Sequence, residues 1–391
     1  MTGAPSRTEL TKRAADLVPL LKENARWVDE NRRLPDEVIE AVTAAGILRM
    51  RVPKRYGGYE SDMGTVVEVL AELARGCGST SWVSTVWALS SWMAAHFPDS
   101  AQDEVFTSPD VRICGALSPT AVATPVDGGL TVNGKWSFNS GARHSTWNSN
   151  AAVIAHPDGR FEPVMILVPM ADLTVVDDWH TVGLRGSGSI TTIAEEVFVP
   201  QDRMLLLEPV LQGNASSTLN ADSPVFRAPF MPTACATITG TPLGLAYAAK
   251  EAFFERLPGR KITYTEYTSQ QEAPLTHLQV AEALTKVNEA EFHAGHAAAM
   301  IDGSAADEQP WKVEQRARIR LEMGMTTQRA KEAVDILAVA SGGSSVYHDV
   351  PIQRIERDIK TIGLHAIMHP DTNAELYGRV ACGLEPNTQY I

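Results

Sequence analysis

Residues 127–141, which read DGGLTVNGKWSFNSG, decide the fold because the sequence changes here from helical to β patterning. The alternation in Leu130-Thr131-Val132 is typical of a strand, and another strand-like segment follows at 164–168. Asp-Gly and Asn-Gly pairs, which favour tight hairpins, lie at 127–129, 133–134 and 158–159. We therefore expect an antiparallel β-domain from about Val111 to Pro200.

Helical periodicity flanks this β region on both sides. Before it, apolar residues recur every three or four positions in 38–47 and 66–73. After a loop rich in Asn, Ser and Pro, we expect long helices that include 274–301 and 309–340. The fold class is therefore α+β, with a helical domain, a β-domain and a C-terminal four-helix bundle. The predicted domains cover residues 1–110, 111–230 and 231–391.

Composition narrows the classes of function. The chain has 391 residues, and its 34 basic and 47 acidic side chains give a formal charge of −13. This acidic balance argues against nucleic-acid binding, which usually needs a basic surface. The most apolar stretch, Ala234–Phe254, is interrupted by glycines, a proline and a lysine, so we expect a buried helix and no membrane span.

The N-terminus has no apolar signal-peptide core. The cysteines are scattered without a Cys-x-x-Cys pair, which suits reduced thiols in the cytoplasm better than a disulfide framework. They are Cys77, Cys114, Cys235 and Cys382. We expect a cytoplasmic protein.

Three motifs are misleading on inspection. Residues 129–135 fit Gly-x-x-x-x-Gly-Lys, but Trp136 follows where a phosphate-binding loop needs Ser or Thr. Residues 183–189 are glycine-rich but do not form Gly-x-Gly-x-x-Gly, so we expect no nicotinamide-binding domain. Glu289, His293 and His296 could share a helix face, but they lack a matched ligand set, and we expect no metal site.

Four segments in order carry a resemblance that spans nearly the whole chain. They are 114–119 (CGALSP), 134–147 (GKWSFNSG, then His144 and Trp147), 179–200 (WHTVGLRGSGS to VFVP) and 341–358 (SGG to PIQRIERD). In this order they resemble the acyl-CoA dehydrogenase superfamily. The two middle segments are more similar to its flavin-dependent two-component (group D) monooxygenases, which include phenol, dibenzothiophene and aromatic polyketide hydroxylases.

One departure separates this sequence from the dehydrogenases of that superfamily. They place a carboxylate near the positions of His365 or Ala366, or on another C-terminal helix, to remove an α-proton. Here residues 361–369 read TIGLHAIMH and contain no acid. This argues against dehydrogenation, although a base on another helix remains an alternative.

The resemblance implies a flavin site. Trp136 and Trp179 would cover the isoalloxazine ring, with plain core packing as the alternative for both. Ser140 would hold the flavin N5 or a peroxide, and Ser118 belongs to the same set of cofactor-binding candidates. Arg185 and Ser187, with Ser189 beside them, suit phosphate or ribityl oxygens. Gly342 and Gly343 would permit close helix approach at a subunit interface near the flavin phosphates.

His365 is the candidate catalytic base. It follows Arg357 at the spacing of the monooxygenase relatives, and an imidazole with a pKa near 6.5 can accept a phenolic proton. His369, one turn later, is the alternative base. Surface or capping roles remain open for both histidines.

The function implied by the resemblance is a reduced-flavin-dependent monooxygenase of an aromatic substrate, phenolic or of the polyketide type found in antibiotic biosynthesis. A separate NAD(P)H:flavin reductase would supply FMNH2 or FADH2, which reacts with O2 to give a C4a-hydroperoxyflavin. Oxygenation of an amine or amino sugar is the alternative, and acyl-CoA dehydrogenation comes third. We expect a homotetramer. The sequence leaves open the substrate, the position hydroxylated and the choice between FMN and FAD.

Overall fold

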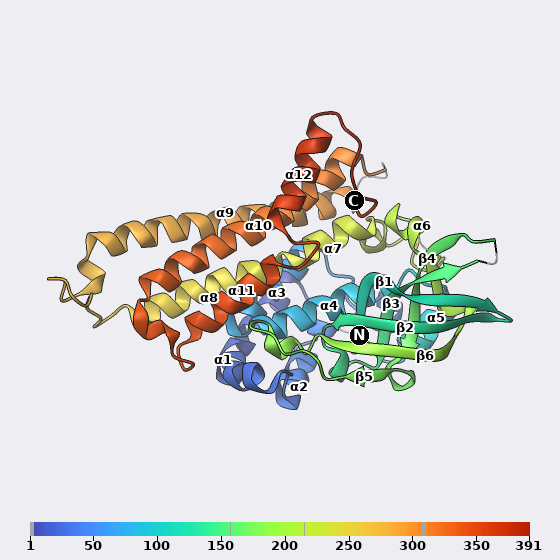
Figure 1. The fold of residues 1–391 in the computed structure, drawn as a ribbon, viewed down its shortest axis with the longest axis horizontal. Coiled ribbons are helices and arrows are strands. Elements are labelled where there is room, and N and C mark those ends of the chain that lie inside the picture. Colours follow the sequence, from blue (N-terminus) through green and yellow to red (C-terminus); the bar gives the residue numbers. More distant parts are fainter. Residues whose placement is uncertain (1–3, 157, 215, 306–309) are drawn as a thin grey trace.

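The computed structural model describes residues 4–156, 158–214, 216–305 and 310–391. Residue 309, where the second long helix is predicted to begin, lies outside them. The chain order is helices, then a sheet, then helices, as the sequence predicts (Figure 1). The strands lie at one end of the molecule, and the long C-terminal helices extend from them to the other end.

The N-terminal region is helical, as the periodicity in its sequence predicts. In the first helix, the Ser6 side chain accepts a hydrogen bond from the Glu9 N–H, while the Glu9 carboxylate accepts from the Ser6 N–H, which forms a capping box. Two buried helices meet at Cys77, between Gly76 and Gly78. The helices are α1 (Arg7–Asn31), α2 (Asp36–Ala44), α3 (Met63–Gly76), α4 (Gly78–Ala94) and α5 (Asp99–Val105).

The central sheet has the strand order β5-β6-β2-β1-β3-β4-β7. Its strands are β1 (Ile113–Val126), β2 (Gly129–Asn139), β3 (Trp147–Ala155), β4 (Phe161–Pro169), β5 (Thr174–Val176), β6 (Ile190–Pro200) and β7 (Met204–Leu206). Neighbouring strands are antiparallel except β1 and β3, which are parallel. The predicted antiparallel β-domain is therefore confirmed, with β1 and β3 as the one parallel pair: β2 and β3 lie on opposite sides of β1.

The hairpin predictions succeed at two of three sites. Gly128 lies in the turn that joins β1 to β2, and Gly159 lies between β3 and β4; both have positive φ, 77° and 85°. The prediction at Asn133-Gly134 is wrong, because these residues lie inside β2 at a shift in its register with β6. A Cβ on Gly134 would lie 2.5 Å from the Ala121 Cα, so this glycine serves close strand approach and not a turn.

The C-terminal region consists of helices α6 (Leu207–Leu211), α7 (Phe230–Ile238), α8 (Gly240–Arg256), α9 (Pro274–Ala305), α10 (Val313–Ala340), α11 (Pro351–Gly363) and α12 (Pro370–Ala381). The single buried helix expected over Ala234–Phe254 is in fact α7 and α8, which meet at Thr239. Pro242 cannot donate a backbone hydrogen bond in the first turn of α8. A Cβ on Gly244 would lie only 2.1 Å from the Ala71 carbonyl oxygen, so the glycines of α8 allow it to pack closely on α3.

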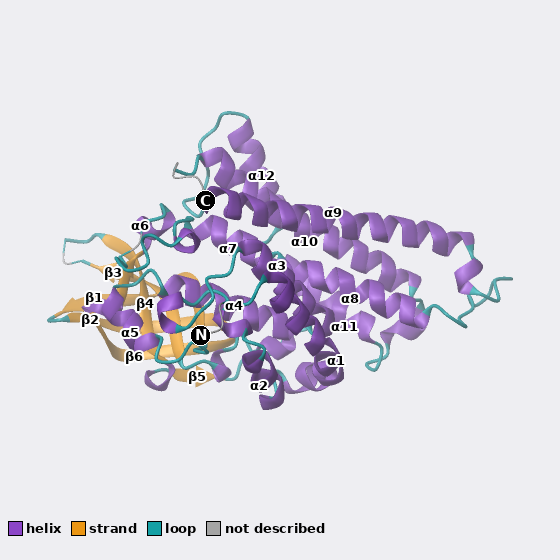
Figure 2. Ribbon diagram, turned by 180° about the vertical axis from the view of Figure 1, so that it is seen from behind, coloured by secondary structure: helices purple, strands orange, loops and turns teal. Residues whose placement is uncertain are grey.

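Helix α4 is almost entirely buried and contacts both the sheet and the C-terminal helices α7, α8 and α11 (Figure 2). A separate, small apolar core lies within the sheet and includes Trp136. Among the described residues, no helix is both long and apolar enough to cross a membrane.

Candidate active site

The turn that follows β2 places Ser140 beside helix α4. Gly141 has φ 71°, and a Cβ there would lie 2.8 Å from the Val83 Cγ1, so the turn packs directly on the helix. Two buried tryptophans of α4 hold the turn. The indole N–H of Trp82 donates to the Ser140 Oγ at 3.0 Å, and that of Trp87 donates to the Ser145 Oγ at 3.0 Å.

Ser140 begins a chain of buried hydroxyl groups. Its Oγ lies 2.7 Å from the Ser189 Oγ, which lies 2.7 Å from the Ser187 Oγ. The Ser187 hydroxyl donates to the Leu184 carbonyl oxygen at 2.7 Å. The Trp179 indole N–H donates to the same carbonyl at 3.0 Å. The structure therefore connects three of the predicted site residues, Ser140, Ser187 and Trp179.

Helix α11 joins this network through Asp358. The Leu184 N–H donates to the Asp358 Oδ1 at 2.6 Å, and Asp358 is 3% exposed. A Cβ on Gly183 would lie 2.1 Å from the Arg357 carbonyl oxygen, so α11 and the loop are in direct contact. Desolvation raises the pKa of Asp358 to about 6, although the Leu184 N–H and Arg354 favour its charged form.

His365 follows the end of α11 and packs against Trp82. The two rings are in an edge-to-face arrangement, with their centroids 5.5 Å apart and an interplanar angle of 65°. Desolvation lowers the pKa of His365 to about 4. The residue as a whole keeps exposed surface, so solvent offsets part of this effect. The pKa of His365 therefore lies below the value near 6.5 expected from the sequence, because desolvation of the ring disfavours its charged form.

Trp82 is the residue that sequence reasoning misses. It contacts two of the predicted site residues, Ser140 through a hydrogen bond and His365 through an edge-to-face ring contact. The sequence does contain a signal, because three tryptophans lie in one apolar helix at 82, 87 and 92. Buried indoles need a hydrogen-bond acceptor, but the sequence does not say which one.

His369 has different surroundings. It precedes α12, and its carbonyl oxygen accepts a hydrogen bond from the Asn373 side chain at 2.9 Å. Its Nδ1 is buried without a hydrogen-bond partner among the described residues. A catalytic role for His369 stays a prediction.

Trp136 and Arg185 have structural partners that the sequence does not reveal. Trp136 is 1% exposed inside the sheet, and its indole N–H donates to the Ala151 carbonyl at 2.6 Å. This is the core packing named above as its alternative role. Arg185 donates to the carbonyl oxygens of Asp29 at 2.9 Å and Thr181 at 2.8 Å. Their flavin contacts stay predictions.

The remaining cofactor candidates lie apart from the hydroxyl chain. Ser118 is exposed on β1, at an irregularity in its pairing with β3. Gly342 has φ 64°, and Gly343 begins a short turn of helix after α10. A Cβ on Gly343 would meet nothing within 4 Å in the same chain, so the close helix approach stays a prediction. Its place at a subunit interface stays a prediction.

The histidines of α9 have a structural explanation. His293 and His296 both place Nδ1 on the buried Glu322 carboxylate, at 2.5 and 2.9 Å, and Arg318 pairs with the same group. These contacts hold the pKa of Glu322 below its usual value despite burial. The described residues contain no group of three side chains suited to a metal ion.

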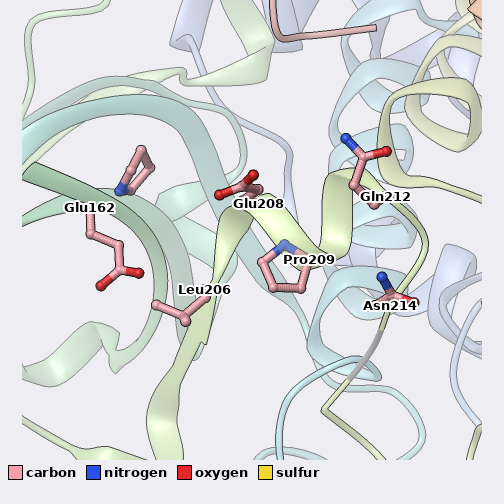
Figure 3. Close-up of a pocket in the computed structure, with 7 residues that line it drawn as sticks. Glu162, Leu206, Glu208, Pro209, Gln212 and Asn214 are labelled. Atoms are coloured by element: carbon pink, nitrogen blue, oxygen red, sulfur yellow. The ribbon is translucent and has the colours of Figure 1, made fainter.

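A surface cavity of about 330 Å³ lies elsewhere, between β4, β7 and α6 (Figure 3). Its lining residues are Glu162, Pro163, Leu206, Glu208, Pro209, Gln212 and Asn214. Two carboxylates and no basic side chain make this lining unsuited to the phosphate of a flavin. The cavity shares no residue with the Ser140 network.

The fold and this network define a member of the acyl-CoA dehydrogenase superfamily. The family model "Acyl-CoA dehydrogenase, N-terminal domain" matches residues 9–109, and "Acyl-CoA dehydrogenase, C-terminal domain" matches residues 236–370. Within the superfamily, the chain belongs to the oxygenase subunits of the flavin-dependent monooxygenases, and it is an enzyme. Both parts of the resemblance seen in the sequence are thereby confirmed.

Individual relatives cover almost the full length of the chain. The oxygenase subunit HsaA of Rhodococcus jostii is 32% identical over 94% of this chain and 97% of its own. The FADH2-dependent resorcinol hydroxylase oxygenase component of a Rhizobium species is 30% identical, over 97% and 96%. The structure of XiaF from a Streptomyces species, in complex with FADH2 and glycerol, superposes with a TM-score of 0.92 at 30% identity, over 98% and 97%.

We predict that Asp358→Asn removes a pH dependence of stability. The folded pKa, about 6, lies above the ordinary value of 3.8. The folded chain therefore holds the proton more tightly, and its stability falls as the pH rises from about 4 to about 6, by about 3 kcal/mol. Asn keeps an acceptor for the Leu184 N–H without the charge, so the variant loses this decrease.

Urea unfolding at a series of pH values from 4 to 8 measures the effect. The control is Asp16→Asn, which changes an exposed carboxylate of α1 and should keep the wild-type pH dependence. An Asp358→Asn profile parallel to the wild type would contradict the prediction.

Proposed function

We propose that this chain uses reduced flavin and O2 to hydroxylate an aromatic substrate of the phenol type. The observation that carries the proposal is Trp82, which contacts both Ser140, the predicted flavin contact, and His365, the predicted substrate contact. Residues that the resemblance assigns to cofactor and to substrate therefore share one neighbour. The named substrate of the Rhizobium relative, resorcinol, is itself a phenol.

The surroundings of Ser140 fit a flavin. Beside its turn, Phe138 is 67% exposed and lies edge-to-face with the half-buried Trp179, with centroids 5.8 Å apart. Phe138 also adopts a left-handed φ of 67°, which is uncommon for a bulky residue and concentrates at functional sites. These aromatic faces offer apolar surface to a planar ring system. Bound flavin would supply the electrons and the O2 chemistry that side chains lack.

His365 is suited to orient the substrate oxygen. With a pKa near 4 the ring is neutral at pH 7. Its Nδ1 accepts the Ile367 N–H at 3.3 Å, which assigns the ring proton to Nε2. The Nε2–H can then donate to a phenol or phenolate oxygen. Because a phenol has a pKa of about 10, full proton transfer to this imidazole is unfavourable in the free chain, and stabilisation of a phenolate is the role that the geometry favours.

The alternatives receive less support. The buried carboxylate of α11, Asp358, already accepts the Leu184 N–H and faces the loop, so it is a poor candidate for a dehydrogenase base. Oxygenation of an amine is not favoured, since the relatives above include a phenol hydroxylase. The narrower hypothesis of a polyketide-type substrate in antibiotic biosynthesis rests on the resemblance alone.

The electron source is proposed to be a separate NAD(P)H:flavin reductase. In the described residues, the parallel strands β1 and β3 are linked through β2 and not through an α-helix, so they form no dinucleotide-binding βαβ unit. NAD(P)H is a cytoplasmic reductant, and Cys77, Cys114 and Cys235 are free and buried. A cytoplasmic location is consistent with both.

We predict that the purified chain alone does not oxidise NADH, and that a flavin reductase with free FMN or FAD restores hydroxylation of a simple phenol such as resorcinol. NADH absorbance and product chromatography measure the two steps. The control is the reductase without this chain, which should form H2O2 but no hydroxylated product. NADH oxidation by the chain alone would overturn the two-component scheme.

We also propose a homotetramer. Support comes from large exposed apolar side chains on and beside the C-terminal helices, where the relatives' subunit interface is expected. They are Leu275, Leu278, Phe292, Val339, Val346 and Tyr347. Light scattering at micromolar concentration should give four times the chain mass of 42.4 kDa, and a stable monomer would overturn this proposal.

We predict that His365→Ala lowers hydroxylation by about 10²–10⁴-fold while the protein still folds and binds flavin. Without the imidazole, reduction of O2 should end as H2O2 and not as product. His365→Gln keeps an N–H donor and should lose much less. Product yield per NADH consumed measures this coupling.

The matched comparison is His369→Ala, which should keep coupling near that of the wild type. Equal losses in His365→Ala and His365→Gln would point to a base and not a donor. Coupling at the wild-type level in His365→Ala would remove His365 from the mechanism.

A further inference from the structure

The hydroxyl chain from Ser140 to Leu184 has a single possible proton order. Each serine hydroxyl carries one proton, so it can donate one hydrogen bond. The Leu184 carbonyl cannot donate, so the proton between it and the Ser187 Oγ, 2.7 Å away, belongs to Ser187. Ser187 must then accept from Ser189, and Ser189 must accept from Ser140.

The contact at the other end of the chain is compatible with this direction. The Trp82 indole N–H cannot accept a hydrogen bond, so it donates to the Ser140 Oγ. Ser140 thus receives one hydrogen bond from α4 and gives its only proton to Ser189. All three serines are buried, with exposures of 4%, 1% and 4% for Ser140, Ser187 and Ser189, so water does not compete readily for these protons.

This order leaves Ser140 able to act only as a hydrogen-bond acceptor toward a further partner. A hydroxyl oxygen has two acceptor positions, of which Trp82 occupies one. Ser140 can therefore accept one more hydrogen bond but cannot donate one without breaking its bond to Ser189. Ser140, which the resemblance places at the flavin N5 or a peroxide, is therefore an acceptor toward that partner.

We propose that Ser189 is a positioning residue, which fixes Ser140 as a hydrogen-bond acceptor and so makes the site select reduced over oxidised flavin. The inference rests on the proposed function and on the predicted contact between Ser140 and the flavin N5. In reduced flavin N5 carries a hydrogen and donates, whereas in oxidised flavin N5 has only a lone pair and accepts. An acceptor at Ser140 therefore pairs with the N5–H of reduced flavin. It leaves the N5 lone pair of oxidised flavin without a hydrogen bond, which lowers the affinity for that form.

Removal of Ser189 should release the Ser140 proton. In Ser189→Ala, Ser140 keeps the Trp82 hydrogen bond but loses its own acceptor, so its proton becomes available to oxidised N5. We expect the ratio of the dissociation constants for oxidised and reduced flavin to fall about tenfold. Equilibrium dialysis of FMN and FAD measures it, with the reduced forms under anaerobic conditions. The two-electron potential of bound flavin should fall by about 30 mV, the equivalent of a tenfold change.

One control variant separates proton order from packing. Ser149→Ala removes a hydroxyl of the sheet that is also buried, at 3% exposure, and whose Oγ has no partner among the described residues. It should leave the ratio unchanged.

Each outcome tests a stated step. A Ser189→Ala ratio equal to that of the wild type, or a Ser149→Ala ratio that falls as far, overturns the positioning role. Should Ser189→Ala fail to fold, Ser187→Ala serves instead, because it removes the acceptor of the Ser189 proton and frees the same chain; an unchanged ratio there also overturns the role. A wild-type protein that binds neither form of flavin overturns the proposed function itself.

Discussion

The peptide groups of Leu184 hold the site together. This buried leucine has φ 48° and ψ 32°, a left-handed conformation that costs a non-glycine residue about 1–2 kcal/mol. Its N–H donates to Asp358 of α11, and its carbonyl oxygen accepts from Ser187 and Trp179. These hydrogen bonds help to offset the strain. The loop, the last helix before His365 and the hydroxyl chain are therefore ordered by one residue.

Helix α4 performs the corresponding role from the other side. It lies between the sheet and the C-terminal helices, and its indole N–H groups fix the turn that carries Ser140. His365 and Ser140 are far apart in the sequence and belong to different regions of the fold. Trp82 contacts both, so any tilt of α4 would change the relation between the predicted cofactor and substrate contacts. The hydrogen bonds from the buried indoles of α4 therefore hold the turn that carries Ser140 in place.

Much of the fold and only part of the site could be predicted from the sequence. Helix and strand regions follow local periodicity, and Gly128 and Gly159 marked real turns. Gly134 misled because a glycine that admits a neighbouring strand has the same sequence signature as one that permits a turn. Ser140, Ser187 and Trp179 were found through motifs. Trp82 and Asp358 received no role in the predicted site, because their function depends on tertiary contacts with Ser140 and Leu184.

Desolvation connects the electrostatics of the site to its chemistry. It raises the pKa of Asp358 and lowers that of His365, because a low-dielectric environment disfavours the charged form of acids and bases alike. At pH 7 the imidazole is neutral, and the serines between the two groups carry no charge. Ser140 is itself buried, so little water competes for its one free acceptor position. The directed hydroxyl chain, which carries no charge, is then the means by which the site can distinguish a hydrogen-bond donor from an acceptor.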